Sequence, residues 1–213
     1  MDRERLVARL AAAGFVAAEE EAEELVASAG GDRAVLEALA LRAVERLPGG
    51  GAAVDVCTGS GAVAAVLLDR RPGARVVATD LDPRAVACAV SNGVDAREGD
   101  LYAPVPRELE GRVDVVTGVV PYVPDGELGL LQRDTFTFES ALAYSGGADG
   151  TEVLRRVVAE APRFLRRGGA LLLELGGDEA RRLEPDLVRA GYGDVEVLAD
   201  EEGDVRGVQA TLL

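Results

Sequence analysis

The sequence predicts an α/β fold in which seven strands form a mostly parallel sheet that ends in an antiparallel hairpin. Short apolar runs alternate with helical segments between residues 52 and 190, which is typical of parallel strands joined by helical crossovers. The last two apolar runs are separated only by a short acidic turn, and strands joined so closely pair antiparallel. The earlier residues show helical spacing, so we divide the chain into a short N-terminal helical segment at 1–48 and a sheet domain at 49–213.

The N-terminal segment is predicted to be helical because its apolar residues recur three and four positions apart, as on one face of a helix. The clearest set is Val35, Leu36, Leu39, Val44 and Leu47. Pro48 and the three glycines after it interrupt this pattern, and the interruption marks the start of the sheet domain.

The first half of the sheet domain is predicted to contain two strand–helix units and a third strand. Asp82 carries a side chain that accepts a hydrogen bond from the first turn of a helix, and Pro83 is favoured at the first helical position. Asn92 and Gly93 are expected to end the same helix. The predicted strands are 52–56, 75–79 and a short strand before Gly99, and the predicted helices are 61–69 and 83–90.

The second half is predicted to contain four strands and two helices. The run Ala170–Leu175 is apolar at almost every position, as expected for a strand that is buried on both faces. Gly168 and Gly169 are expected to end the long helix before it. The predicted strands are 113–117, 170–175, 195–198 and 207–212, and the predicted helices are 150–165 and 179–190.

The composition excludes several kinds of catalytic site. The chain has no lysine and no histidine, so all 23 basic residues are arginines. A Schiff-base lysine, a phosphate-binding loop lysine, a histidine triad and a histidine-ligated zinc site are therefore impossible. Catalysis has to rely on carboxylates, tyrosine, cysteine, hydroxyls, arginine, backbone groups or a bound cofactor, and we predict no metal site.

The charge balance and the cysteines indicate which partners and compartment to expect. With 23 basic against 38 acidic residues, the formal net charge is −15, which argues against a nucleic-acid partner. No apolar run is long enough to cross a membrane, and the N-terminus lacks the apolar core of a signal peptide. Cys57 and Cys88 do not form a disulfide framework, so we expect a reduced, cytoplasmic protein. The sequence gives no indication of an oligomeric state.

A glycine turn joins the first predicted strand to the first predicted helix. Gly59 and Gly61 allow the backbone to turn tightly and to approach a ligand closely. Asp80 lies 19 residues after Gly61, at the end of the next strand, where a carboxylate can bind two ribose hydroxyls. Asp100 follows the third strand and can accept a hydrogen bond from an adenine amino group. Because open α/β sheets bind ligands at the carboxyl ends of their strands, these residues and Asp55 predict a nucleotide site.

Two nucleotide cofactors fit a glycine turn of this kind. An NAD(P)-binding oxidoreductase is the less favoured alternative, because common dehydrogenases use a tyrosine–lysine pair or a histidine and this chain has no lysine or histidine. S-adenosylmethionine (SAM) requires less of the protein, since its sulfonium already carries an activated methyl group. Alignment of donor and acceptor alone can contribute roughly 7–11 kcal/mol to catalysis.

Several segments resemble known motifs. Three segments resemble the SAM-binding motifs of class I methyltransferases: VDVCTGSGAVAAVLL, ATDLDPRAVACAVSN and EGDLY. Three others resemble the HemK/PrmC-type family, which methylates the side-chain amide of a glutamine in peptide release factors. These segments are VDVVTGVVPYVP, ESALAYSGGADGTEVLRRVVAEAPRFLRRGGALLLELG and DEEGDVRGVQATL. The resemblance covers about residues 52–213 and implies a Rossmann-like class I methyltransferase fold with SAM as cofactor.

The resemblance also implies the cofactor-binding residues. In such a site Asp80 binds the ribose, Asp100 binds the adenine, Leu101 packs near the adenine, and Cys57 stands where the family has a glycine. The implied cofactor site consists of Asp55, Cys57, Thr58, Gly59, Gly61, Asp80, Leu81, Asp100 and Leu101.

The acceptor pocket departs from the family pattern. The family has Asn-Pro-Pro-Tyr after its fourth strand, and its asparagine hydrogen-bonds the target amide. This chain has Val119, Val120, Pro121 and Tyr122 there, and a valine side chain forms no hydrogen bond. Val119, Pro121 and Tyr122 are the candidate catalytic positions, and all four residues together with Glu139 are the candidate acceptor-binding residues.

Three functions remain open on this basis. The first is a SAM-dependent methyltransferase with a divergent acceptor pocket, whose acceptor is a small molecule or another protein. The second is a true release-factor glutamine methyltransferase that works without the asparagine. The third is a SAM-binding interaction protein without catalytic activity.

Glu174, in the strand 170–175, is expected to be a buried and paired structural acid.

Overall fold

The computed structural model describes residues 36, 38–130, 143–200 and 202–213. The chain divides into two compact units, Met1–Ala38 and Leu39–Leu213, and the second contains the whole sheet. The helical residues 39–46 belong to this second unit. Their arginines contact the end of the sheet, where Arg42 pairs with Glu196 and Arg46 donates a hydrogen bond of 3.2 Å to Thr211. The remaining predicted helices at 1–35 lie outside the described residues.

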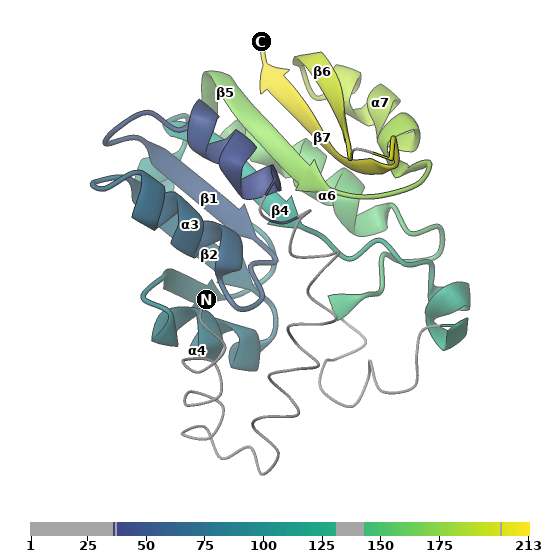
Figure 1. The fold of residues 1–213 in the computed structure, drawn as a ribbon, viewed down its shortest axis with the longest axis horizontal. Helices are drawn as coiled ribbons and strands as arrows, with labels where there is room; N and C mark the ends of the chain where they lie inside the picture. The colour runs from purple at the N-terminus through teal and green to yellow at the C-terminus, as the bar shows by residue number, and fades with distance from the viewer. Residues whose placement is uncertain (1–35, 37, 131–142, 201) are drawn as a thin grey trace. The chain divides into compact units, whose positions relative to one another are not determined.

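Seven strands form one sheet in the order β3-β2-β1-β4-β5-β7-β6 (Figure 1). The strands from β3 to β5 are parallel, whereas β7 is antiparallel to both β5 and β6. The mostly parallel sheet that ends in an antiparallel hairpin is thus confirmed. The strands are β1 Ala52–Val56, β2 Arg75–Asp80, β3 Asp95–Glu98, β4 Val113–Val119, β5 Leu165–Glu174, β6 Tyr192–Ala199 and β7 Val205–Leu212.

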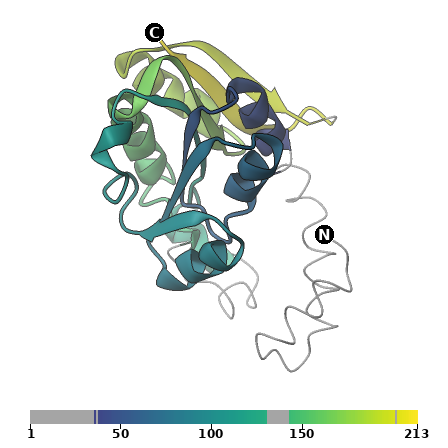
Figure 2. The same cartoon turned by 90° about the vertical axis from the view of Figure 1, so that its left-hand side faces the viewer.

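Helices lie on both faces of the sheet, as the turned view in Figure 2 shows. Asp82 caps α4 as expected, because its carboxylate accepts a hydrogen bond of 2.8 Å from the backbone of Arg84, and Pro83 is the first helical residue. The α-helices are α3 Ala62–Arg70, α4 Pro83–Ser91, α6 Glu152–Glu160 and α7 Glu179–Arg189. Short 3₁₀ turns are η1 Arg107–Leu109, η2 Asp125–Leu130 and η4 Ala161–Arg163.

The core is built around β5, whose residues Leu171 to Leu173 are fully buried. Alternate side chains of a strand point to opposite faces, so Leu171 and Leu173 face one helical layer and Leu172 faces the other. Leu154 of α6 and Leu183 of α7 belong to the same buried cluster as Leu171 and Leu173. Aliphatic side chains thus form most of the core, and they fix the carboxyl ends of β1, β4 and β5 relative to one another.

The predicted end of the long helix is wrong. We predicted a helix to Leu165 that ends at Gly168 and Gly169, but α6 ends at Glu160 and Leu165 already belongs to β5. Pro162 explains the difference, because it has no N–H to donate and its ring clashes with the preceding helical turn. The glycines lie instead within β5, where the register with β4 shifts between Val113 and Val115.

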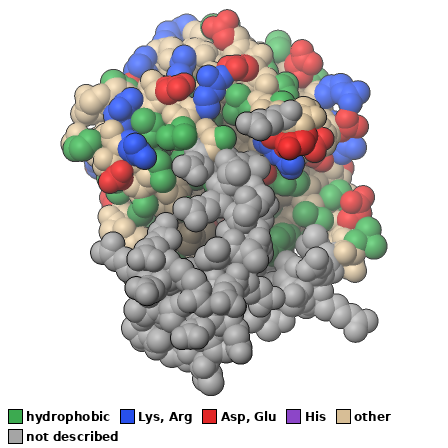
Figure 3. Space-filling view, viewed as in Figure 1, with side chains coloured by type: hydrophobic (Ala, Val, Ile, Leu, Met, Phe, Trp, Pro, Cys, Tyr) green, Lys and Arg blue, Asp and Glu red, His purple; other side chains and the backbone are tan. Residues whose placement is uncertain are grey.

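Within the described part of the chain, no helix is both long and apolar enough to span a bilayer. Figure 3 shows one face of the molecule. On the described part of this face, arginines and acidic side chains are interspersed and form no continuous basic area.

Candidate functional site

The glycine turn lies between β1 and α3 and contains three residues with a left-handed backbone. Their φ angles are 53° at Cys57, 56° at Gly59 and 80° at Gly61. The turn is closed by a hydrogen bond of 2.9 Å from the Gly61 amide to the Thr58 carbonyl, and Thr58 donates to the Thr79 carbonyl of β2 at 3.0 Å. A left-handed backbone favours glycine, so Cys57 occupies a position that a glycine would fit without strain.

Gly61 is required by packing as well as by conformation. A Cβ atom there would lie 2.9 Å from the Cβ of Ala89 and 3.1 Å from a methyl group of Val94. At Gly59, by contrast, nothing lies within 4 Å of such an atom. Gly61 therefore allows α3 to approach α4 closely, while Gly59 leaves open space above the turn for a ligand.

Asp80 ends β2 and is held directly against the glycine turn. One carboxylate oxygen accepts a hydrogen bond of 2.8 Å from the Gly59 amide, and the other accepts one of 2.9 Å from the Asp82 amide. Each carboxylate oxygen has two acceptor positions, so both can still accept a ligand hydroxyl. Leu81, which follows Asp80, is 52% exposed and presents an apolar side chain beside it.

Asp55 occupies a different place from the one expected of a cofactor-binding residue. It is 1% exposed, and its two carboxylate oxygens accept hydrogen bonds from Thr58 at 2.5 Å and from Thr117 at 2.7 Å. The side chain thus lies inside the protein and joins β1 to the turn and to β4. Asp55 therefore holds the glycine turn and β4 in position through buried hydrogen bonds.

Burial raises the pKa of Asp55 from its ordinary 3.8 to about 6, although hydrogen bonds from Thr58, Thr117 and the backbone of Ala64 oppose the rise. The folded protein therefore binds a proton at the Asp55 carboxylate more tightly than the unfolded chain does. The resulting stabilisation is complete below about pH 4 and is lost as the pH rises through 6, and it amounts to about 3 kcal/mol.

We expect Asp55→Asn to remove this pH dependence, because the asparagine side chain stays neutral. The free energy of unfolding, measured by denaturant titration between pH 4 and 7, should fall in the wild type relative to the variant as the pH rises. A difference between the two proteins that stays constant over this range would contradict the raised pKa of Asp55.

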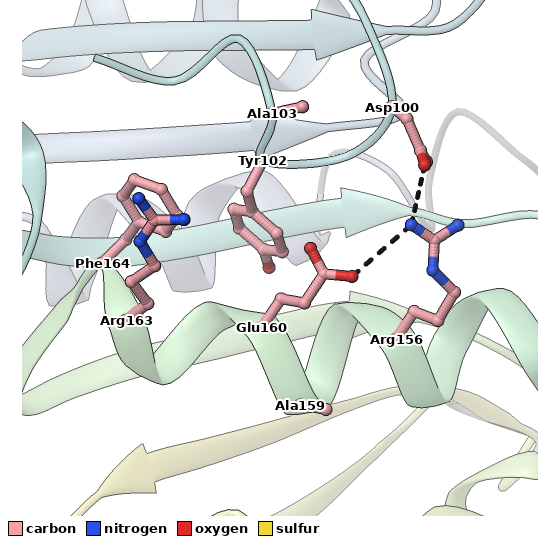
Figure 4. A pocket seen from close by; sticks show the side chains of 8 residues that line it. All are labelled: Asp100, Tyr102, Ala103, Arg156, Ala159, Glu160, Arg163 and Phe164. Carbon is pink, nitrogen blue, oxygen red and sulfur yellow. Dashed lines mark hydrogen bonds and ion pairs between the residues drawn. The ribbon is translucent and has the colours of Figure 1, made fainter. Parts of the chain in front are cut away.

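Asp100 and Leu101 follow β3, where Leu101 has a left-handed φ of 45°. Leu101 is buried and packs in the main core cluster, whereas the Asp100 side chain is 54% exposed. The Asp100 carboxylate forms an ion pair of 2.8 Å with Arg156 of α6. Asp100 and Arg156 line a cavity of about 420 Å³. Its wall also includes Tyr102 and Phe164, as Figure 4 shows. The expected adenine-binding carboxylate thus lies at the edge of a cavity with aromatic residues in its wall.

Cys57, in the glycine turn, is half-buried. Burial, followed by the negative charges of Asp80, Asp55 and Asp100, raises the pKa of its thiol to about 12. The thiol therefore stays protonated at neutral pH, and Cys57 acts as a small neutral wall of the site.

The candidate acceptor residues lie at the end of β4. Val119 is its last residue and is half-buried, as are Pro121 and Tyr122. Val120 is only 1% exposed and belongs to the core, and its predicted contact with the acceptor stays a prediction. The Tyr122 hydroxyl lies 3.4 Å from Oε1 of Glu174, at the outer limit of hydrogen bonding. A second cavity, of about 290 Å³, adjoins Tyr122.

Three residues near the site were not predicted as site residues. Thr117 and Arg156 contact Asp55 and Asp100, and Glu174 was expected to be a buried structural acid but is half-buried beside Tyr122. Alternation along β4 could have indicated Thr117, because residues two positions apart on a strand share a face with Val119. Glu174 meets Val119 only through the pairing of β4 with β5. Glu139 lies outside the described residues.

Curated proteins resemble this chain over the sheet domain. A release factor glutamine methyltransferase from Cereibacter sphaeroides is 37% identical over 167 residues, which cover 75% of this chain and 59% of the relative. A ribosomal protein uL3 glutamine methyltransferase from Burkholderia pseudomallei is 36% identical over 160 residues, which cover 70% of this chain and 50% of the relative. This chain therefore spans only about half to three fifths of the length of these relatives.

A solved structure shares the fold. A release factor-specific protein-(glutamine-N5) methyltransferase from Alicyclobacillus acidocaldarius superposes with a TM-score of 0.51 at 27% identity, covering 84% of this chain and 91% of that one. No family profile matches the sequence. The relatives confirm that the sheet domain resembles the release factor glutamine methyltransferases, and the superposition confirms the Rossmann-like methyltransferase fold.

Proposed function

We propose that this chain is a SAM-dependent methyltransferase whose acceptor is the side-chain amide of a glutamine in a protein. The cofactor part of the proposal rests on Asp80, which is fixed against the glycine turn by the amides of Gly59 and Asp82. Its carboxylate stands at the end of β2, where it can accept hydrogen bonds from the two ribose hydroxyls, and Asp100 stands at the end of β3 for the adenine.

Of the two acceptor classes that the sequence left open, the relatives favour a protein over a small molecule. Both curated relatives are glutamine methyltransferases by name, one for release factors and one for a ribosomal protein. The pocket beside Tyr122 has walls that include Val123, Pro124 and Leu130, which suit the aliphatic part of a glutamine side chain. Proteins rather than metabolites are therefore the first acceptors to test.

Bound SAM would supply a methyl group on a positively charged sulfur. Methylation of an amide forms one N–C bond, breaks the S–C bond and releases one proton from the nitrogen. The chain's contribution is to orient the amide and to exclude water. We assign this role to Pro121 and Tyr122, which come two and three residues after the end of β4 and are half-buried.

The test is incubation of the protein with methyl-labelled SAM and a purified bacterial release factor. We expect the release factor to be labelled, and a release factor whose acceptor glutamine is replaced by alanine to stay unlabelled. Purified ribosomal protein uL3 and a metabolite extract serve as parallel acceptors. Binding of SAM with no labelling of any protein would contradict the proposal and favour the non-catalytic alternative. Labelling of metabolites alone would return the acceptor to the small-molecule class.

A further inference from the structure

We propose that Glu174 takes the place of the missing asparagine and accepts the hydrogen bond from the acceptor amide. This inference rests on the proposed function and names the side chain that recognises the glutamine. It is needed because the residue at the asparagine position, Val119, cannot form a side-chain hydrogen bond, and the chain's only asparagine is Asn92 in α4–β3.

The sheet register places Glu174 beside Val119. β4 and β5 are parallel, and Val119 is the direct partner of Glu174 at the carboxyl ends of both strands. Residues in register on neighbouring parallel strands point to the same face of the sheet, with their strands about 4.8 Å apart. A glutamate is longer than a valine by two heavy atoms along its side chain, so its carboxylate can reach over the space that an asparagine at position 119 would fill.

One contact of Glu174 lies on the side of this space. The Tyr122 hydroxyl lies 3.4 Å from Oε1 of Glu174. Tyr122 follows Val119 by three residues, so this contact places the Glu174 carboxylate in the turn that carries the candidate acceptor residues.

A carboxylate at this point would select a particular acceptor. A carboxylate only accepts hydrogen bonds, so in this proposal Glu174 suits the N–H groups of a glutamine amide and disfavours the carboxylate of a glutamate. An asparagine would offer both a donor and an acceptor and would repel glutamate less. In this proposal the Glu174 carboxylate also accepts a hydrogen bond from the N–H that loses its proton on methylation.

The experiment measures methylation of a release factor, and of a peptide containing its acceptor glutamine, by wild type and Glu174→Leu. We expect Glu174→Leu to lower kcat/KM about 10- to 100-fold, as for the loss of a hydrogen bond to a buried amide, with SAM affinity unchanged. Glu184→Gln, on the exposed side of α7, is the control and should keep wild-type kinetics.

A rescue variant separates this role from a structural one. Adding Val119→Asn to Glu174→Leu should restore at least part of the lost activity, because asparagine again offers the amide an acceptor. In the presence of S-adenosylhomocysteine, the wild type should also bind the glutamine peptide more tightly than the matching glutamate peptide, and Glu174→Leu should lose most of that preference.

The possible failures are distinct. A wild type that labels no glutamine would overturn the proposed function and this inference with it. A wild type that labels glutamine, with Glu174→Leu kinetics and peptide preference unchanged, would overturn this inference alone. A folded Glu174→Leu variant that loses activity, is not rescued by Val119→Asn and keeps its peptide preference would also overturn it.

Discussion

Replacement of Asp80 by alanine is expected to weaken SAM binding at least about tenfold. The variant loses charge-assisted hydrogen bonds to the ribose, each of which contributes about 1.5–3 kcal/mol. It also loses the bonds that the Asp80 carboxylate accepts from Gly59 and Asp82, so the glycine turn is held less firmly. Isothermal titration calorimetry with SAM gives the dissociation constants directly.

Two further variants identify the cause of this loss. Asp80→Asn keeps one acceptor oxygen but loses the charge, so its affinity should lie between those of the wild type and Asp80→Ala. Asp95→Ala removes an exposed carboxylate on the neighbouring β3, where Asp95 pairs with Arg97, and should leave SAM binding unchanged. Equal affinity of the wild type and Asp80→Ala would remove Asp80 from the cofactor site.

Replacement of Gly61 by alanine is expected to lower the free energy of unfolding by about 2–5 kcal/mol. A left-handed backbone costs a residue with a Cβ about 1–2 kcal/mol, and the overpacked side chain adds about 1–3 kcal/mol. The added atom would lie 2.9 Å from the Cβ of Ala89, so α3 and α4 would have to move apart. Denaturant titration, with and without SAM, measures the loss.

Gly59→Ala is the matched control in the same turn. Its φ of 56° is also left-handed, but nothing lies within 4 Å of an added Cβ, so only the conformational cost of about 1–2 kcal/mol is expected. Its larger effect should be on SAM binding, because the added methyl group would enter the space left for the ligand. Equal destabilisation by the two substitutions would show that packing against Ala89 does not decide the need for glycine at position 61.

Much of the fold could be predicted from the sequence, because local signals and tertiary structure agree. Alternation of apolar runs with helices gave the parallel sheet, and Asp82 with Pro83 gave the start of α4. The end of α6 was mispredicted because Gly168 and Gly169 were taken as the terminator, although Pro162 stops the helix earlier. Glycines within a strand can mark a β-bulge and need not indicate the end of a helix.

The site was predicted less completely, because alternation along a strand shows which of its residues share a face but not which face is buried or which strands pair. Asp55, Asp80 and Asp100 all come near the ends of strands, yet only Asp55 points into the core toward Thr117. Val120 was assigned to the acceptor wall by its place in a motif, although packing buries it. Glu174 becomes a neighbour of Val119 only through the pairing of β4 with β5.

The central claim is that SAM binds over the carboxyl ends of β1, β2 and β3, with its ribose on Asp80. A crystal structure of the protein grown with S-adenosylhomocysteine tests it most directly. We predict density for the nucleoside above the turn at Gly59, with both ribose hydroxyls within hydrogen-bonding distance of the Asp80 carboxylate and the adenine beside Leu101. A nucleoside bound elsewhere, or this region empty at saturating concentration, would contradict the claim.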